Sequence, residues 1–309
     1  MAAVPDGAAV QAASRGRPEP RRRGAQRRGL RRWAWLFSLP ALAAFLVFAW
    51  YPTLMAFVVA FQSYKVVGPV HWVGWANFAR ALHDPVVPVA LRNSFYYVLL
   101  TICLTFWVPI IVSILLMEMG ERTRRTMMIL WFIPMPAVAG TVIWKYLYDP
   151  NYGPLAVLFH RLGLPNFGWL NNPHWAMFLI VLPSLVMYGP GLIYISTLQA
   201  VSQELYEAAE LDGASFLRKV WAITLPTLRP IISILLLLSV IGGLQVFTQP
   251  YIMTNGGPIF ATLTMVLYIY RSAFHYLEFG YADVLAILLF LILAVFVVIS
   301  RRLERGRDS

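Results

Sequence analysis

Hydrophobic positions along the chain gather in six long runs in which Asp, Glu, Lys, Arg and His are absent. Each run is close to the ~20 residues that a helix needs to cross the ~30 Å hydrocarbon core of a bilayer. The six runs are Ala34–Phe61, Ser94–Met117, Thr126–Trp144, Trp175–Leu198, Pro230–Met253 and Val284–Ser300. The pattern predicts an all-α polytopic membrane protein with six transmembrane helices.

Two apolar segments need separate treatment. Leu263–Tyr270 is too short to cross a bilayer and is followed by Arg271, so we expect an interfacial or re-entrant segment there. The first run follows an arginine-rich stretch, as a signal peptide would. It is far longer than the ~7–15 residues of a signal-peptide core and lacks a small-x-small cleavage site, so we interpret it as a span.

The composition agrees with a membrane protein. Hydrophobic residues make up 59% of the 309 residues and charged residues only 13%, whereas soluble domains carry ~25% charged residues. This balance excludes a water-soluble enzyme. Cys103 is the single cysteine, which excludes an intramolecular disulfide, a CxxC redox pair and a cysteine-based zinc site.

Basic residues predict the orientation in the membrane. The net charge is +11, but 19 of the 25 Lys and Arg residues lie in residues 1–33, 118–125, 199–229 and 300–309. The positive-inside rule therefore places both termini in the cytoplasm, and the charge indicates topology rather than nucleic-acid binding. We expect residues 1–33 to be a disordered arginine-rich tail, residues 34–302 the transmembrane domain and residues 303–309 a cytoplasmic tail.

Ionisable groups at the span ends argue against an ion-coupled carrier. Glu118, Lys145, Arg229 and Asp283 border the spans, whereas proton relays need such groups at depth. Sodium sites made of carbonyls and hydroxyls remain compatible with this pattern. A membrane-embedded enzyme would need a cluster of catalytic polar groups at one depth, and the sequence predicts neither catalytic nor metal-binding residues.

The chain lacks a nucleotide-binding motif of its own. A phosphate-binding P-loop has Gly directly before Lys, but the three lysines, Lys65, Lys145 and Lys219, follow Tyr, Trp and Arg. Any energy from ATP must therefore come from another subunit.

One long cytoplasmic loop, residues 199–229, has a helix–turn–helix pattern. Ser202 suits the N-cap of a first helix, Gly213 a left-handed residue that ends it, and Ser215 the start of a second helix toward Pro226. Ala208 and Ala209 give the first helix a small, smooth face. Periodicity alone leaves two interpretations: an amphipathic connector on the bilayer, or a helix that enters a groove in another protein.

The residues of this loop resemble a known family. Glu207-Ala208-Ala209-x-x-Asp212-Gly213-Ala214, followed by Ile223-x-Leu225-Pro226, is similar to the EAA loop of permease subunits in binding-protein-dependent ABC importers. Val220 departs from that pattern, which more often has Phe. Thr254–Pro258, Tyr270–Phe274 and Phe279–Ala282 resemble the maltose, trehalose and glycerol-3-phosphate type of sugar permease, and specifically the first of its two partner permeases.

The resemblance implies a type I ABC importer permease fold in a bacterial or archaeal cell membrane. It implies as partners a second homologous permease, two copies of an ABC ATPase and an extracytoplasmic sugar-binding protein. The chain itself would hold no cofactor, and the ATPase would bind ATP and Mg. The residues expected to couple to the ATPase are Glu207, Ala208, Ala209, Asp212, Gly213, Ala214, Leu225 and Pro226.

The same resemblance indicates a substrate path on the fourth and fifth spans. Sugar hydroxyls need polar partners, and the apolar face of a sugar ring stacks on aromatic side chains. The candidate residues are Tyr188, Ser239, Gln245, Phe247 and Gln249. Hydrogen bonding between helices is an alternative role for each. Gly242 and Gly243 stand where some relatives have larger contacts. A non-sugar solute such as glycerol-3-phosphate or another phosphoester is the alternative substrate, and a basic cavity would favour it.

We predict that Ser14 lies in the cytoplasm and Asn171 outside the cell, because of the distribution of basic residues. Cysteines placed at these two positions in a Cys103→Ala background should react with a membrane-impermeant thiol reagent from opposite sides. Labelling of both from the same side would contradict the predicted topology.

Overall fold

The computed structural model describes residues 35–65, 68–131, 137–165, 167–186 and 191–305, and these are helical apart from loops and one short hairpin. The hairpin pairs β1 (Gln62–Ser63) with β2 (His71–Trp72) in antiparallel register. The chain divides into two compact units that meet between Ala56 and Phe57. The second unit contains every site discussed below.

Four helices in the described residues are long and apolar enough to cross a membrane. They are Trp35–Val59, Val86–Met117, Phe216–Leu244 and Phe279–Arg302. The first, second and last of these helices overlap predicted spans. The second begins at Val86 rather than Ser94, and the last begins at Phe279 rather than Val284. The predicted spans Thr126–Trp144 and Trp175–Leu198 each include residues outside the described ranges, so their continuity remains a prediction.

Three of these four helices contain a π-helical turn between shorter segments, and 3-10 turns occur elsewhere in the described residues. In the first unit and its continuation these are η2 (Leu46–Trp50) and α3 (Tyr51–Val59). The segments that follow are α4 (Ala76–His83), α5 (Val86–Leu100), η3 (Thr101–Thr105), α6 (Val108–Met117), α7 (Glu121–Trp131), α8 (Ala137–Leu147), α9 (Pro154–Arg161), η4 (Trp169–Asn171), α10 (Ala176–Val181), η5 (Leu182–Leu185) and α11 (Gly191–Gln199). The remainder are α12 (Gln203–Leu211), α13 (Phe216–Lys219), η6 (Val220–Thr224), α14 (Leu225–Leu244), α15 (Thr248–Thr254), α16 (Met265–Tyr270), η7 (Arg271–His275) and α17 (Phe279–Arg305).

The predicted span Pro230–Met253 was wrong at its C-terminal end, whereas the predicted helix that starts after Ser215 and runs toward this span is present. The helix begins at Phe216, ends at Leu244, and a separate helix α15 follows. Pro250 explains the break, because inside a continuous helix its ring would clash with the carbonyl of Val246. In the observed structure Pro250 lies in the first turn of α15, where proline is tolerated. The hydroxyl of Thr264 donates to the freed Val246 carbonyl at 2.9 Å.

The segment Leu263–Tyr270 was predicted to be interfacial or re-entrant. The structure has a short helix there, α16, with Met265, Leu267 and Tyr268 buried, and its position relative to the membrane stays a prediction. Its N-terminal approach crosses α5, where Asn93 donates to the carbonyls of Phe260 and Leu263 at 2.7 and 3.0 Å. Ser94 accepts a hydrogen bond from the Met265 amide at 2.9 Å. Polar side chains of α5 therefore hold the non-helical stretch that leads into α16. They add to the backbone hydrogen bonds that the amides of Ala261 and Leu263 donate to Pro258 and Phe260.

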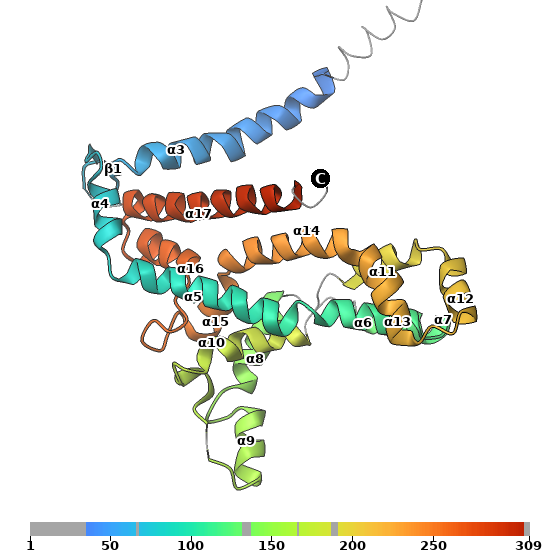
Figure 1. Cartoon of the computed structure of the whole chain (residues 1–309). Helices are drawn as coiled ribbons and strands as arrows, with labels where there is room; N and C mark the ends of the chain where they lie inside the picture. Colours follow the sequence, from blue (N-terminus) through green and yellow to red (C-terminus); the bar gives the residue numbers. More distant parts are fainter. Residues whose placement is uncertain (1–34, 66–67, 132–136, 166, 187–190, 306–309) are drawn as a thin grey trace, which may run out of the picture. The chain divides into compact units, whose positions relative to one another are not determined.

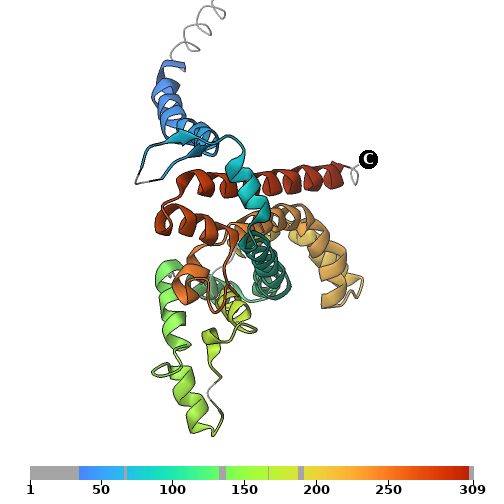
Figure 2. The same ribbon diagram turned by 90° about the vertical axis from the view of Figure 1, so that its left-hand side faces the viewer.

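Helix packing in the second unit places α14 against α5 and α16 against α17, as Figures 1 and 2 show from two directions. Gly243 permits the first contact, because a Cβ atom there would lie 2.8 Å from Cγ2 of Val98. Leu244, Leu263, Leu267 and Leu285 are among the residues of the buried core that these helices share. This core fixes the break after α14 relative to α5.

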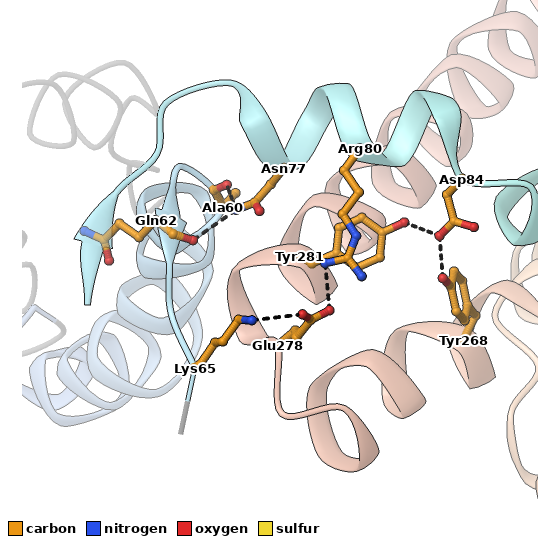
Figure 3. Close-up of polar contacts among 9 residues, drawn as sticks. All are labelled: Ala60, Gln62, Lys65, Asn77, Arg80, Asp84, Tyr268, Glu278 and Tyr281. Carbon is orange, nitrogen blue, oxygen red and sulfur yellow. Dashed lines mark hydrogen bonds and ion pairs between the residues drawn. The ribbon is translucent and has the colours of Figure 1, made fainter. Parts of the chain in front are cut away.

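A polar cluster ties the end of α4 to α16 and to the first turn of α17 (Figure 3). Asp84 accepts hydrogen bonds from the hydroxyls of Tyr268 and Tyr281. Arg80 lies 4.0 Å from the ring centroid of Tyr281 and pairs with Glu278 at 2.7 Å. The residues of the Phe279–Ala282 motif therefore serve, at least in part, to assemble this cluster.

The same cluster fixes the β1 segment. Asn77 donates to the carbonyls of Ala60 and Gln62 at 2.9 and 3.0 Å, and Lys65 pairs with Glu278 at 3.3 Å (Figure 3). Gly280 permits the close approach, because a Cβ atom there would lie 2.1 Å from the Gln62 carbonyl oxygen. Asn77 and the Phe279–Ala282 motif, far apart in the sequence, therefore meet in space.

We expect Asp84→Asn to lower the free energy of unfolding by about 2 kcal/mol, because hydrogen bonds to a charged group contribute ~1.5–3 kcal/mol each. Burial acts to raise the pKa of Asp84, but the hydroxyls of Tyr268 and Tyr281, the Val86 amide and Arg80 together hold that pKa below its ordinary value. The stabilisation is therefore complete above the ordinary carboxyl pKa of about 4 and is lost as the pH falls through the lower folded value.

The measurement is thermal unfolding of the detergent-solubilised protein, followed by tryptophan fluorescence at pH 7 and at about pH 3, where the difference between the unmodified protein and Asp84→Asn should become smaller. Asp149→Asn is the matched control, because Asp149 is bonded to the amides of Asn151 and Tyr152 in an exposed turn that Asn can also form. Equal midpoints for Asp84→Asn and Asp149→Asn would show that the cluster contributes nothing.

Candidate functional site

Four of the five predicted substrate-path residues line one cavity of about 330 Å³. Ser239 comes from α14, Gln245 from the break that follows it, and Phe247 and Gln249 from the N-terminus of α15. Tyr188, the fifth residue, lies outside the described residues. The break that the sequence did not predict is the feature that brings the other four together.

Two residues of the second span complete this cavity and were missed by the sequence reasoning. Tyr97 lies near the end of α5, and Thr101 opens the π-helical turn η3. π-helical turns inside α-helices are often found at functional sites. The available signal was the presence of a tyrosine and a threonine within the apolar run Ser94–Met117, but only tertiary packing shows which face they occupy.

An aromatic group stands beside the cavity. The ring of Phe247 is stacked on Tyr251 at 5.0 Å between centroids, and Tyr270 lies 5.0 Å from Phe247. Tyr251 and Tyr270 therefore hold Phe247 at the cavity wall. The two glycines of α14 have different surroundings: a Cβ atom at Gly243 would meet Val98, whereas one at Gly242 would meet no atom within 4 Å.

The lining of the cavity is uncharged. Beside the residues already named, Gly242, Gly243, Val246 and Thr248 line it, so that hydroxyls, amides and an aromatic ring are its chemical groups. Such a lining can hydrogen-bond the hydroxyls of a neutral solute and contact the apolar face of a ring. Among the described residues, the lining offers no cation to a phosphate group.

The loop of residues 199–229 has the predicted helix–turn–helix form. Ser202 occupies the N-cap of α12 without a side-chain hydrogen bond, and Gly213 has φ +71°, the left-handed value expected. The amide of Gly213 donates to Glu210 and that of Ala214 to Ala209, both at 2.9 Å. This pair of bonds is a Schellman motif, which ends α12 and turns the chain toward α13.

The exposed face of α12 includes most of the predicted coupling residues. Glu207, Ala208, Asp212 and Gly213 are exposed, and Ala209 and Ala214 are half-buried. Leu225 and Pro226 lie on another helix, in the first turn of α14. The sequence reasoning missed Leu211, whose side chain is 91% exposed beside the turn. Figure 1 shows α12 and α13 together at the end of α14 that is farther from α15.

A metal centre has no basis in the described part of the chain. No three His, Cys, Asp or Glu residues there gather closely enough to hold an ion.

Comparisons with known proteins identify the family. Residues 87–308 match the model of the binding-protein-dependent transport system inner membrane component. The chain is 34% identical to the arabinooligosaccharides transport system permease protein AraP of Bacillus subtilis (strain 168), over 87% of this chain and 88% of that protein. It is 30% identical to the trehalose/maltose transport system permease protein MalF of Thermococcus litoralis, over 88% of this chain and 94% of MalF.

The fold also matches a solved structure. A chain in the crystal structure of a bacterial alginate ABC transporter, in complex with an alginate pentasaccharide-bound periplasmic protein, superposes with a TM-score of 0.80 at 20% identity. The match covers 93% of this chain and 98% of that chain. The predicted ABC importer permease fold is confirmed.

The chain is an inner-membrane subunit of a transport system. It belongs to the family of binding-protein-dependent transport system inner membrane components. The predicted family is thereby confirmed. So is the prediction that the chain is a transport subunit rather than an enzyme.

Proposed function

We propose that the chain is a permease subunit of an ATP-driven importer and that it conducts a neutral mono- or oligosaccharide through the cavity between α5, α14 and α15. The uncharged lining of hydroxyls, amides and Phe247 is the observation that carries this proposal. Relatives named for arabinooligosaccharides and for trehalose and maltose support it. A phosphoester would need a cationic partner, and the residues that line the cavity include none.

The proposed assembly follows from the family. A second homologous permease, two copies of an ABC ATPase and an extracytoplasmic sugar-binding protein would complete the importer. The structure of the alginate transporter with its periplasmic protein supports the last of these partners. The chain would have six transmembrane helices with both termini in the cytoplasm, as the distribution of basic residues favours.

The proposed contact with the ATPase is α12. Its outward face offers Glu207, Ala208 and Asp212, and the neighbouring Leu205 and Leu211 are exposed apolar side chains. A helix with small residues on one face can lie close to the floor of a groove in a partner. ATP binding would move this contact, and access to the cavity would alternate as the two permeases shift.

We predict that Gln245→Ala lowers import of a radiolabelled oligosaccharide at least about fivefold, because the cavity loses a group that hydrogen-bonds sugar hydroxyls. The assay uses membrane vesicles that contain both permeases, the ATPase and the binding protein, with ATP inside. Ser196→Ala is the control, since its hydroxyl is exposed and bonds only the Ile193 carbonyl among the described residues. The substrate-path assignment fails if Gln245→Ala imports normally. Absence of ATP-dependent saccharide import by the unmodified complex would refute the proposed function itself.

We predict that Gly213→Val reduces retention of the ATPase during purification and reduces import, whereas Gly213→Asn retains both. A Cβ atom at Gly213 meets no atom within 4 Å, so the effect of Val arises from the left-handed backbone rather than from a clash. A β-branched residue is strained there by ~1–3 kcal/mol, and Asn tolerates that conformation.

Two further variants separate the turn from the surface. Glu207→Lys keeps the turn but reverses a charge on the outward face of α12, and it should also weaken retention of the ATPase. Arg80→Ala changes the cluster around Asp84 and should leave that retention unchanged. Full retention and normal import in both Gly213→Val and Glu207→Lys would show that the loop is only a connector.

A further inference from the structure

The inner face of α12 is fixed to the helix that follows it by two side-chain contacts. Lys219 donates from Nζ to Oε1 of Glu210 at 2.6 Å. Tyr206 and Thr224 share a hydrogen bond between their hydroxyls, with 3.1 Å between the oxygens. Tyr206 and Glu210 are four residues apart, so they lie on one face of α12, opposite the face proposed to contact the ATPase.

The two partners of Lys219–Glu210 differ in exposure. The side chain of Lys219 is 10% exposed, whereas that of Glu210 is 61% exposed. A buried ammonium group is costly unless a carboxylate stays beside it. Lys219 therefore constrains the position of Glu210, and through it the position of α12, more strongly than a surface ion pair would.

Lys219 also faces charges from other helices. It lines a cavity of about 430 Å³ together with Glu118 at the end of α6 and Arg124 on α7. Gln199 at the end of α11 and Gln203 at the start of α12 are on the same cavity wall. The Lys219–Glu210 pair thus stands where the cytoplasmic ends of several helices meet, with room for one element to move against the others.

A single long helix connects the Lys219–Glu210 pair to the proposed sugar cavity. Phe216–Leu244 is continuous over 29 residues, which at 1.5 Å per residue spans ~43 Å. Lys219 and Thr224 lie in its first third, and Gln245 directly follows its last residue. A displacement of its cytoplasmic end therefore reaches the cavity without passing through a loop.

We propose that Lys219 and Glu210 form a positioning pair that makes α12 and the helix Phe216–Leu244 move as one body, so that movement at the ATPase contact reaches the sugar cavity. This inference rests on the proposed function. With the pair removed, α12 would still present its outward face to the ATPase. It would then shift without moving the helix by the same amount, and ATP would be hydrolysed with less sugar transported.

The test uses the complete importer in membrane vesicles and measures saccharide import and ATP hydrolysis in the same sample. The variants are Lys219→Met, Glu210→Gln and the exchange Lys219→Glu with Glu210→Lys. Arg218→Met is the matched control, because Arg218 is the adjacent basic residue, is exposed, and has no hydrogen bond or ion pair with the described residues. Retention of the ATPase in the purified complex is the readout of intact docking.

We expect Lys219→Met and Glu210→Gln to retain the ATPase and hydrolyse ATP within about twofold of the unmodified complex, while sugar imported per ATP falls about tenfold, the effect of one charge-assisted hydrogen bond. The exchanged pair should recover at least about half of the original ratio. Arg218→Met should leave the ratio unchanged. Should Lys219→Met fail to assemble, Glu210→Gln supplies the same measurement, because the amide oxygen of Gln can still accept a hydrogen bond from Lys219 although the carboxylate charge is gone.

Three results would overturn the inference: an unchanged ratio in Lys219→Met or Glu210→Gln, equal loss in Arg218→Met, or an assembled exchange variant without recovery. A parallel loss of ATPase retention and import, with the ratio preserved, would likewise assign the pair to docking or stability alone. Each of these requires that the unmodified complex imports saccharide, and so is distinguishable from failure of the proposed function.

Discussion

Inside a bilayer, every backbone carbonyl released by a broken helix must find another hydrogen-bond donor. The break between α14 and α15 satisfies this constraint through Thr264, which donates to the Val246 carbonyl. Thr264 is in place because Asn93 and Ser94 on α5 hold the chain on both sides of it. The cavity that adjoins the break therefore depends on polar side chains that do not line it.

The hydrophobic pattern was sufficient for most of the long helices, because continuous apolar runs without charge have few other structures available. It was insufficient at the fifth span, where an apolar run continues across the break at Gln245. Pro250 was a local signal of that break, but proline is also tolerated within membrane helices, as Pro230 inside α14 shows. What stabilises the break is the hydrogen bond from the Thr264 hydroxyl to the Val246 carbonyl, and Thr264 lies eighteen residues further along the chain.

In the candidate site, too, some residues could be predicted from local sequence and others only from tertiary packing. Gly213 could be assigned from sequence because a left-handed C-terminal residue is a local requirement, and its φ of +71° agrees. Ser239, Gln245, Phe247 and Gln249 were chosen for their chemistry, and the structure places them in one cavity. Tyr97 and Thr101 come from a distant span, and the packing of α14 on α5 that brings them to the same place has no local sequence signal.

The adjacent glycines of α14 have different roles: Gly243 allows close packing of two helices, and Gly242 lines the cavity. Gly243 cannot accept a side chain without displacing Val98, so the spacing of the two helices is fixed there. Gly242 lines the cavity, and a Cβ atom added at that position would meet no atom within 4 Å. Divergence among related chains can therefore resize the cavity one residue away from a contact that must stay constant. One codon can thus alter the wall of the cavity while the neighbouring codon preserves the distance between two helices.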